Sequence, residues 1–238
     1  VYDYLLGGDN NFELDRLAAE TMLASAPDMR DGALDNRRFL SQAVRLLAER
    51  GIRQFIDIGA GLPTRGSVHE VAREIDPDVQ VVYVDNDPMV VAHGRALIDD
   101  SRNTAYIVGD LRRPAEIFSN QQTRRLINFT EPIAVLMLQI LHLIPADPAH
   151  EAIETYRSRM APGSALAISH VTREGSDPEV IKTIQETAKR SSLPTFVRSR
   201  PEIEAMLAGL ELAAPLDTIA NWRGSRLHGL AGIGLLSG

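Results

Sequence analysis

The chain has 238 residues, of which 44% are hydrophobic and 24% are charged. This composition is typical of a globular protein with one sizeable core and argues against a disordered or fibrous chain. The formal net charge of −7 disfavours nonspecific binding of nucleic-acid phosphates. The absence of cysteine excludes disulfides, zinc–thiolate sites and a cysteine nucleophile, and it fits a reducing cytoplasm.

The sequence also argues against a membrane protein. Its longest apolar stretch, Pro132–Pro145, is too short and too interrupted to span a bilayer. No signal peptide is visible, so we expect a cytoplasmic protein with neither a membrane nor a nucleic-acid partner. The chain begins at Val1 rather than Met, which leaves open whether a leader precedes it.

The first 50 residues have the apolar spacing of helices. One helical pattern covers residues 10–26 and ends at Pro27, and a second covers 32–50 and ends at Gly51. We therefore expect an N-terminal helical cap or lid over residues 1–50. Residues 51–238 form the main domain, and the two parts are expected to make one structural unit.

From residue 51 onward, predicted strands alternate with predicted helices. Helix starts are expected at Asp87-Pro88 and Asp147-Pro148, with each Asp as the N-cap. The alternation indicates an α/β fold of the Rossmann-like, doubly wound type with a mainly parallel sheet. The last two strands have no long helix between them, which leaves room for antiparallel pairing. Strands are predicted at 53–59, 79–85, 104–110, 133–138, 163–171, 210–216 and 226–238, and helices at 66–75, 87–100, 113–127, 147–160, 177–190 and from 201.

The stretch "FIDIGAGLPT" places Asp57, Gly59 and Gly61 at the end of the first predicted strand. Glycines at such a turn let a ligand approach the backbone closely. A dinucleotide fingerprint needs a third glycine where Thr64 stands, and a carboxylate would repel a pyrophosphate at the helix N-terminus. Asp57 would instead suit an ammonium group, as in S-adenosylmethionine, although it could simply accept the turn's N–H groups.

Two further acids end the next two predicted strands. Asp85 can accept both hydrogen bonds of a ribose diol, and it has no evident local role, whereas Asp87 is explained as a helix cap. Asp110 could accept a hydrogen bond from the adenine amino group, with the N–H of Leu111 meeting a ring nitrogen. On its own, an Asp at this position is most often a cap, but with the other two it forms a constellation.

These segments resemble a known family. "DIGAGLPT", "VVYVDNDP", "GDLRRP" and "LHLIP", with "YDYLLGG" and "NRRFL" before them, are similar to S-adenosylmethionine-dependent methyltransferases first recorded as a domain of unknown function. The resemblance covers essentially the whole chain. It implies the class I fold, with seven strands and an antiparallel last strand, and S-adenosylhomocysteine as the product.

The resemblance also implies residue roles. Asp57, Gly59 and Gly61 would hold the methionine portion, Asp85 the ribose, with Asn86 counted in the same site, and Asp110 with Leu111 the adenine. The segment Leu138–His142 would flank the methyl group. The N-terminal segment would form a lid, with Tyr4, Asn10, Asn11 and Phe12 as candidates, although packing and capping explain these residues equally well.

Histidine supplies the candidate for a catalytic base. His142, just past the fourth strand, could take a proton from the methyl acceptor or simply pack between its leucine neighbours. His170, at the exit of the fifth strand, is a weaker candidate that would face the ligand edge. No metal is expected, because "HEVARE" lacks the second histidine of a zinc helix. Trp222 and Arg223 could line the substrate side, but a cation–π contact at the surface is the favoured expectation.

The leading hypothesis is therefore a methyltransferase acting on a small molecule. One alternative is a sensor or interaction module that binds S-adenosylmethionine without turning it over, because methyl transfer has no obligatory catalytic residue to look for. A less favoured alternative is an NAD(P)-dependent oxidoreductase, against which Thr64 and Asp57 argue.

Overall fold

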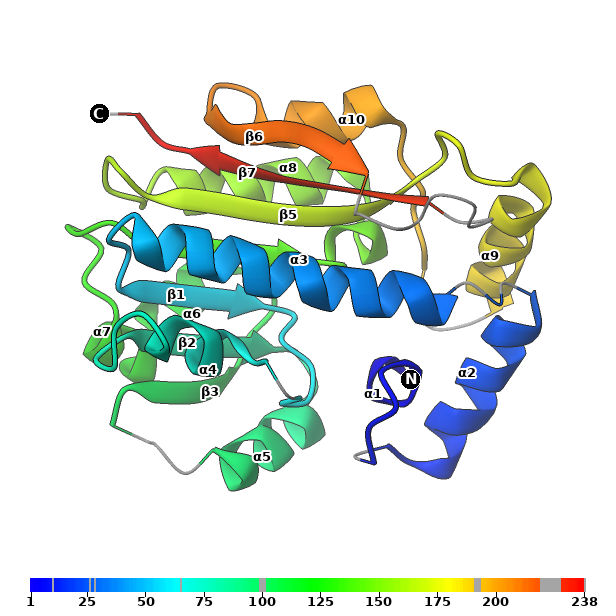
Figure 1. Ribbon diagram of the computed structural model, residues 1–238, viewed down its shortest axis with the longest axis horizontal. Coiled ribbons are helices and arrows are strands. Elements are labelled where there is room, and N and C mark those ends of the chain that lie inside the picture. The colour runs from blue at the N-terminus through cyan, green and yellow to red at the C-terminus, as the bar shows by residue number, and fades with distance from the viewer. Residues whose placement is uncertain are drawn as a thin grey trace.

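The computed structural model describes residues 1–9, 11–25, 27, 29–64, 66–98, 102–190, 194–218 and 228–237. Within these residues, seven strands form one sheet in the order β3-β2-β1-β4-β5-β7-β6 (Figure 1). Strands β1 to β5 pair in parallel. Strand β7 runs antiparallel to both of its neighbours, β5 and β6. The strands are β1 Gln54–Ile58, β2 Gln80–Asp85, β3 Thr104–Val108, β4 Ala134–Leu138, β5 Ala165–Thr172, β6 Glu211–Thr218 and β7 His228–Leu235.

The predicted fold class is confirmed. Central strands such as β1 and β4 are buried along their whole length, as expected for parallel strands covered on both faces. Helices supply that cover. The helices of the described residues are α1 Tyr2–Leu5, α2 Glu13–Ser25, α3 Met29–Glu49, α4 Val68–Arg73, α5 Pro88–Leu97, α6 Pro114–Ser119, α7 Gln121–Leu126, α8 Ala146–Arg157, α9 Pro178–Arg190 and α10 Arg200–Glu204, with short 3₁₀ turns at η1 Leu141–Leu143 and η2 Ala205–Leu207.

Alternate residues of each strand feed two separate cores. Phe55 of β1 packs with α3, α4 and α5 on one face, whereas Ile56 packs with α6, α7 and α8 on the other. This alternation is the two-residue period of a strand, and it gives the molecule three layers. In Figure 1, α3 and α4 lie in front of the sheet, and α5 lies below β3.

The helix starts were predicted with mixed success. Asp87 caps α5 as expected, accepting from the Met89 N–H at 2.8 Å, and Pro88 opens the helix. The prediction for Asp147 is wrong: α8 begins at Ala146, and Asp147 lies within its first turn, where a negative charge favours the helix end. The helix expected at 113–127 is two helices, separated at Asn120, which caps α7.

The N-terminal 50 residues divide into two parts with different surroundings. The long helix α3 contributes Val44 and Leu47, both fully buried, to the core it shares with β1. By contrast, α1 and α2 pack on Ala33 near the start of α3, in a small cluster with Leu5 and Ala19. The main core of the described residues therefore includes most of α3, and α1 and α2 join it only through the start of that helix.

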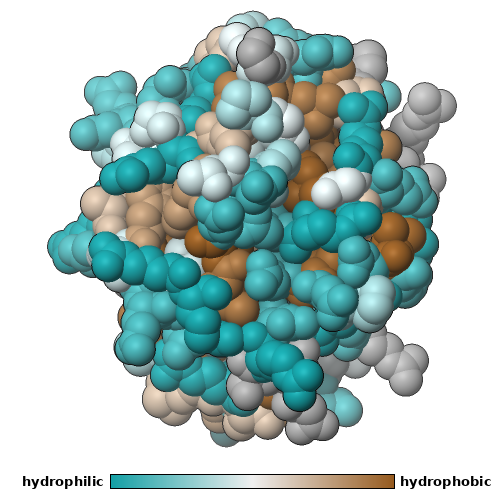
Figure 2. All heavy atoms as spheres, turned by 90° about the vertical axis from the view of Figure 1, so that its left-hand side faces the viewer, coloured by the Kyte–Doolittle hydropathy of each residue, from teal (hydrophilic) through white to brown (hydrophobic). Residues whose placement is uncertain are grey.

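The two ends of the parallel strands have different surroundings. The parallel strands point toward the right of Figure 1, where α1, α2 and α9 lie beyond their carboxyl ends. Figure 2 shows the opposite face, where the strands begin, and it is mostly hydrophilic with small hydrophobic patches. Among the described residues, no helix has the length and apolar character needed to cross a membrane.

If α3 belongs to the core, Leu47→Ala will destabilise the whole protein. Leu47 is fully buried, so we expect a loss of roughly 2–5 kcal/mol in the free energy of unfolding. The matched control is Leu17→Ala in α2, where the side chain is 54% exposed and the change should stay within about 0.5 kcal/mol. Urea unfolding followed by circular dichroism measures both, and equal effects would contradict the assignment.

Candidate functional site

The glycine turn after β1 is tied to the end of β2. The Gly59 N–H donates to the Val84 carbonyl at 2.8 Å, and the backbone at Gly59 and Gly61 has positive φ of 73° and 62°. A Cβ at position 59 would lie 2.7 Å from the side chain of Ile140. Glycine is therefore required at 59 by its φ value and by the segment after β4, which closes over the turn.

Asp57 is a buried acid, with only 6% of its surface exposed. Its pKa is raised to about 7: burial is the main cause, the positive charge of Arg37 opposes it, and the nearby Asp85 adds to it. No backbone N–H of the described turn residues donates to its carboxylate. A cation placed beside Asp57 would favour the ionised form, which is the property expected of a contact for an ammonium group.

Asp85 has a structural role that the sequence did not reveal. One carboxylate oxygen accepts from the Gly61 N–H at 2.9 Å and the other from the Asp87 N–H at 3.0 Å. The expectation that it has no local partner is therefore wrong. Each carboxylate oxygen can accept a second hydrogen bond, so Asp85 remains able to contact a diol, and the ribose role stays a prediction.

A cavity of about 230 Å³ lies where β1 to β4 end. This is the edge at which open α/β sheets bind ligands. The cavity gathers residues from four strand exits that the sequence singled out or placed nearby. They are Ile58, Gly59, Asp85, Asn86, Gly109, Asp110, Leu111, Arg112, Ile140, Leu143, Ile144 and Pro194.

Asp110 is held by its neighbour Arg112. The Arg112 Nε lies 2.9 and 3.0 Å from the two carboxylate oxygens, and its backbone N–H donates to the same group at 2.9 Å. These contacts lower the pKa of Asp110, so it is ionised and acts only as an acceptor at neutral pH. The capping position of α6 is occupied by Arg113, so Asp110 is not the cap of that helix.

A second cavity, of about 370 Å³, lies between the N-terminal segment and the glycine turn. The predicted lid residues Asn11 and Phe12 line it, together with Gly61 and Arg37. Tyr4 is placed differently: its hydroxyl donates to Glu20 at 3.2 Å, and it packs with α2. Asn10, Trp222 and Arg223 lie outside the described residues.

The two candidate histidines lie together but differ in their surroundings. His142 is in η1, and its Nδ1 is buried without a partner. Burial, with a contribution from Arg198, lowers the pKa of His142 to about 4, so the ring is neutral at pH 7 and is a weak base there. The two rings meet edge to face with centroids 5.9 Å apart.

The expectation that His170 faces the ligand edge from a strand exit is wrong. The strand continues to Thr172, and His170 is fully buried. Its Nε2 lies 2.7 Å from Arg198, and its Nδ1 lies 2.6 Å from the Val171 carbonyl. Pairing with β7 extends β5 beyond the end of β4, which explains why His170 is enclosed.

Sequence reasoning missed a polar chain from the N-terminus to the end of β4. Asn36 donates to the Tyr2 hydroxyl at 2.9 Å and accepts from Ser169 at 2.7 Å, and Ser169 in turn accepts from the Gln139 N–H at 3.0 Å. Gln139 has a φ of 52°, rare for a residue with a side chain, and its buried Nε2 has no partner. Tyr2, Asn36 and Gln139 lie in segments that the resemblance singled out, "YDYLLGG", "NRRFL" and Leu138–His142, but Ser169 gave no signal.

The sheet order, the antiparallel β7 and the acids at successive strand exits define a Rossmann-like methyltransferase fold. The family described as S-adenosyl methyltransferase matches residues 1–230. The chain belongs to this family.

Solved structures agree with that assignment. A candidate methyltransferase from Thermobifida fusca YX is 38% identical, with a TM-score of 0.92 over 100% of this chain and 93% of that one. A DUF574 family protein from Streptomyces avermitilis MA-4680 is 30% identical, with a TM-score of 0.93 over 99% and 95%. Magnesium protoporphyrin IX methyltransferase from Synechocystis PCC 6803 with bound SAH shares the fold, at 13% identity and a TM-score of 0.62 over 99% and 93%. No curated protein matches the chain.

The raised pKa of Asp57 predicts that stability falls as the pH rises. The folded-state pKa of about 7 exceeds the ordinary 3.8, so the protonated acid is favoured on folding and this contribution is lost as the pH rises through about 7. The stability of Asp57→Asn relative to the wild type should therefore increase as the pH rises from 6 to 8. The melting temperature should differ by about 2–4 °C for each kcal/mol involved.

Differential scanning calorimetry of the ligand-free protein at both pH values measures this difference. Asp147→Asn, at an exposed acid in the first turn of α8, is the control and should show the same pH dependence as the wild type. A gap between Asp57→Asn and the wild type that stays constant from pH 6 to 8 would contradict the burial argument.

Proposed function

We propose that the protein transfers the methyl group of S-adenosylmethionine to a small-molecule acceptor, with the cofactor held at the carboxyl ends of β1 to β4. The observation that carries this proposal is the 230 Å³ cavity, into which Gly59, Asp85 and Asp110 converge from three different strands. Family membership supports methyl transfer as the reaction class. The residues that line the cavity are the ones we assign to cofactor binding.

The residues present fit this cofactor. The ammonium of its methionine portion would lie beside the Asp57 carboxylate, which burial leaves in need of a cation. Asp85 and Asn86 would accept from and donate to the ribose diol, and Asp110 with the Leu111 N–H would meet the adenine. Arg37, which acts electrostatically on Asp57, carries the charge that complements the cofactor's carboxylate.

An acidic turn is poorly suited to a pyrophosphate. Asp57 and Asp85 both lie at the glycine turn, and the Gly61 N–H that could bind a phosphate oxygen is already bonded to Asp85. The field at this helix start is therefore less favourable to an anion than in a dinucleotide-binding turn. This supports an S-adenosyl cofactor over a nicotinamide dinucleotide.

When bound, S-adenosylmethionine supplies an electrophilic methyl group on a sulfonium. The protein then has to position the acceptor and exclude water. Where the acceptor must lose a proton, His142 is the base we assign, because it is neutral and its buried Nδ1 has no partner. His170 is not assigned a direct role, since both its ring nitrogens are engaged.

Ligand binding separates the proposal from the dinucleotide alternative. S-adenosylhomocysteine at about 100 times its Kd should stabilise the protein by about 2.7 kcal/mol, whereas NAD(H) should leave the melting temperature unchanged. Thermal shift measurements with both ligands provide the comparison. A shift with NAD(H) and none with S-adenosylhomocysteine would overturn the proposal.

Turnover separates an enzyme from a sensor. Labelled S-adenosylmethionine is incubated with a broad panel of small metabolites, and a methyltransferase should label at least one of them. Tight binding with no transfer to any member of the panel would favour a non-catalytic sensor.

Asp85 should contribute directly to cofactor affinity. Asp85→Asn removes a charged acceptor while keeping the size of the side chain, so we expect S-adenosylhomocysteine to bind at least roughly tenfold more weakly. Asp87→Asn is the control, because Asp87 caps α5 and does not line the 230 Å³ cavity, and Asn caps equally well. Isothermal titration calorimetry measures both variants. Equal affinities would show that the ribose assignment is misplaced.

A further inference from the structure

Arg198 is a buried cation beside the proposed methyl-transfer site. Only 3% of its surface is exposed, and it lies just before α10. Among the described residues, its guanidinium makes direct contact with carbonyl oxygens and an imidazole rather than with a carboxylate. The charge of Glu202 acts on it favourably from further away. Burying a cation costs free energy unless hydrogen bonds or an opposite charge compensate it.

The contacts of Arg198 join three segments that are far apart in the chain. Nη1 donates to the Leu141 carbonyl at 2.8 Å and to Nε2 of His170 at 2.7 Å, and Nη2 donates to the Ile144 carbonyl at 2.6 Å. The Nδ1 of His170 faces the Val171 carbonyl, which can only accept, so Nδ1 carries the proton and Nε2 is free to accept from Arg198. His170 thus anchors the guanidinium.

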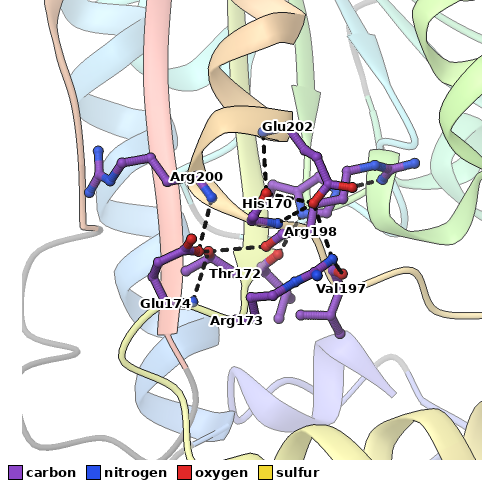
Figure 3. Close-up of polar contacts among 10 residues, drawn as sticks. His170, Thr172, Arg173, Glu174, Val197, Arg198, Arg200 and Glu202 are labelled. Carbon is purple, nitrogen blue, oxygen red and sulfur yellow. Dashed lines mark hydrogen bonds and ion pairs between the residues drawn. The ribbon is translucent and has the colours of Figure 1, made fainter.

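Arg198 is itself fixed against β5. Its carbonyl accepts from the Thr172 hydroxyl at 3.1 Å and from the Arg173 N–H at 3.0 Å, and Thr172 and Arg198 pair as a parallel β-bridge. Figure 3 shows these contacts, together with those of Glu174 and Glu202 around them. The rigid sheet therefore sets the position of the guanidinium.

What Arg198 fixes is the turn between β4 and α8. The two carbonyls it binds belong to the first residue of η1 and to the residue just after it. This turn carries His142, and Ile140, Leu143 and Ile144 from the same segment form one wall of the 230 Å³ cavity. Nη1 and Nη2 thus hold both ends of the segment that shapes the cavity.

His142 lies within this clamp. The Phe196 N–H donates to its carbonyl at 2.7 Å, and its ring rests against His170. The charge of Arg198 acts on both histidines. The charge of Glu202 acts on His170 and on Arg198. Arg198 therefore sits where it can set both the place of the His142 ring and its surroundings.

We propose that Arg198 is a positioning residue for methyl transfer: by bonding the carbonyls of Leu141 and Ile144 and the ring of His170, it holds the 140–144 turn against the cofactor cavity and His142 in its enclosed position. This inference rests on the proposed function. It adds a residue that lies 54 positions along the chain from Ile144 and does not line the 230 Å³ cavity, so it would act through the turn.

The test compares Arg198→Met and Arg198→Lys with Arg173→Met. Arg173 belongs to the same cluster, but it is exposed and contacts Val197 and Glu202 rather than the turn, so it is the matched control. Two quantities are measured on folded protein: affinity for S-adenosylhomocysteine by calorimetry, and the titration of His142 by NMR, with its signal assigned from His142→Gln.

We expect Arg198→Met to weaken binding at least roughly tenfold, the equivalent of one hydrogen bond to a charged group. The His142 pKa should rise from about 4 toward its ordinary 6.5 as the turn loosens and the nearby charge is lost. Arg198→Lys keeps the charge but not the fork of donors, so it should bind more weakly while His142 stays neutral at pH 6. Arg173→Met should change neither quantity.

The outcomes separate this inference from the proposed function. Wild-type protein that fails to bind S-adenosylhomocysteine contradicts the proposed function itself. If the wild type binds, then a folded Arg198→Met with unchanged affinity, or with weaker affinity but an unchanged His142 titration, overturns the positioning role. Should Arg198→Met not fold, wild-type affinity in Arg198→Lys overturns it instead.

Discussion

The site depends on how the first two strands end together. The Gly59 N–H bonds the Val84 carbonyl, and the Gly61 N–H bonds the Asp85 carboxylate, so the glycine turn is fastened to the exit of β2 on both backbone and side chain. The turn closes tightly because both glycines have positive φ. The segment after β4 packs against this turn, because a Cβ at Gly59 would meet the side chain of Ile140.

The ends of the strands were predictable because they are determined by residues that are neighbours in the sequence. A run of apolar residues ended by an acid or a glycine fixes where a buried strand stops, and parallel strands bring their ends to one edge. This is why Asp85, Asp110 and Gly59 were found from the sequence and line one cavity. The cap at Asp87 followed from the same kind of local rule.

Contacts between distant segments were not predictable in this way. Asn36, Ser169 and Gln139 form one hydrogen-bonded chain although up to 133 positions separate them, and no spacing rule links them. His170 was placed at an exit because β5 was judged alone, whereas its pairing with β7 carries the strand further. The N-cap prediction at Asp147 failed for a local reason. Pro148 suits any position in the first turn of a helix, and α8 begins earlier, at Ala146.

Two buried ionisable groups lie on opposite sides of the rim. On the side of β1, Asp57 is enclosed and would gain from a cation, and on the side of β5, Arg198 holds a positive charge against carbonyl oxygens and His170. In the proposed binding mode the cation of the methyl donor lies on the β1 side, whereas the low pKa of His142 keeps its ring in the turn after β4 neutral. At a pKa of about 4 the imidazole holds a proton only weakly at neutral pH, so His142 can serve an acceptor that loses a proton only if the bound ligands raise that pKa.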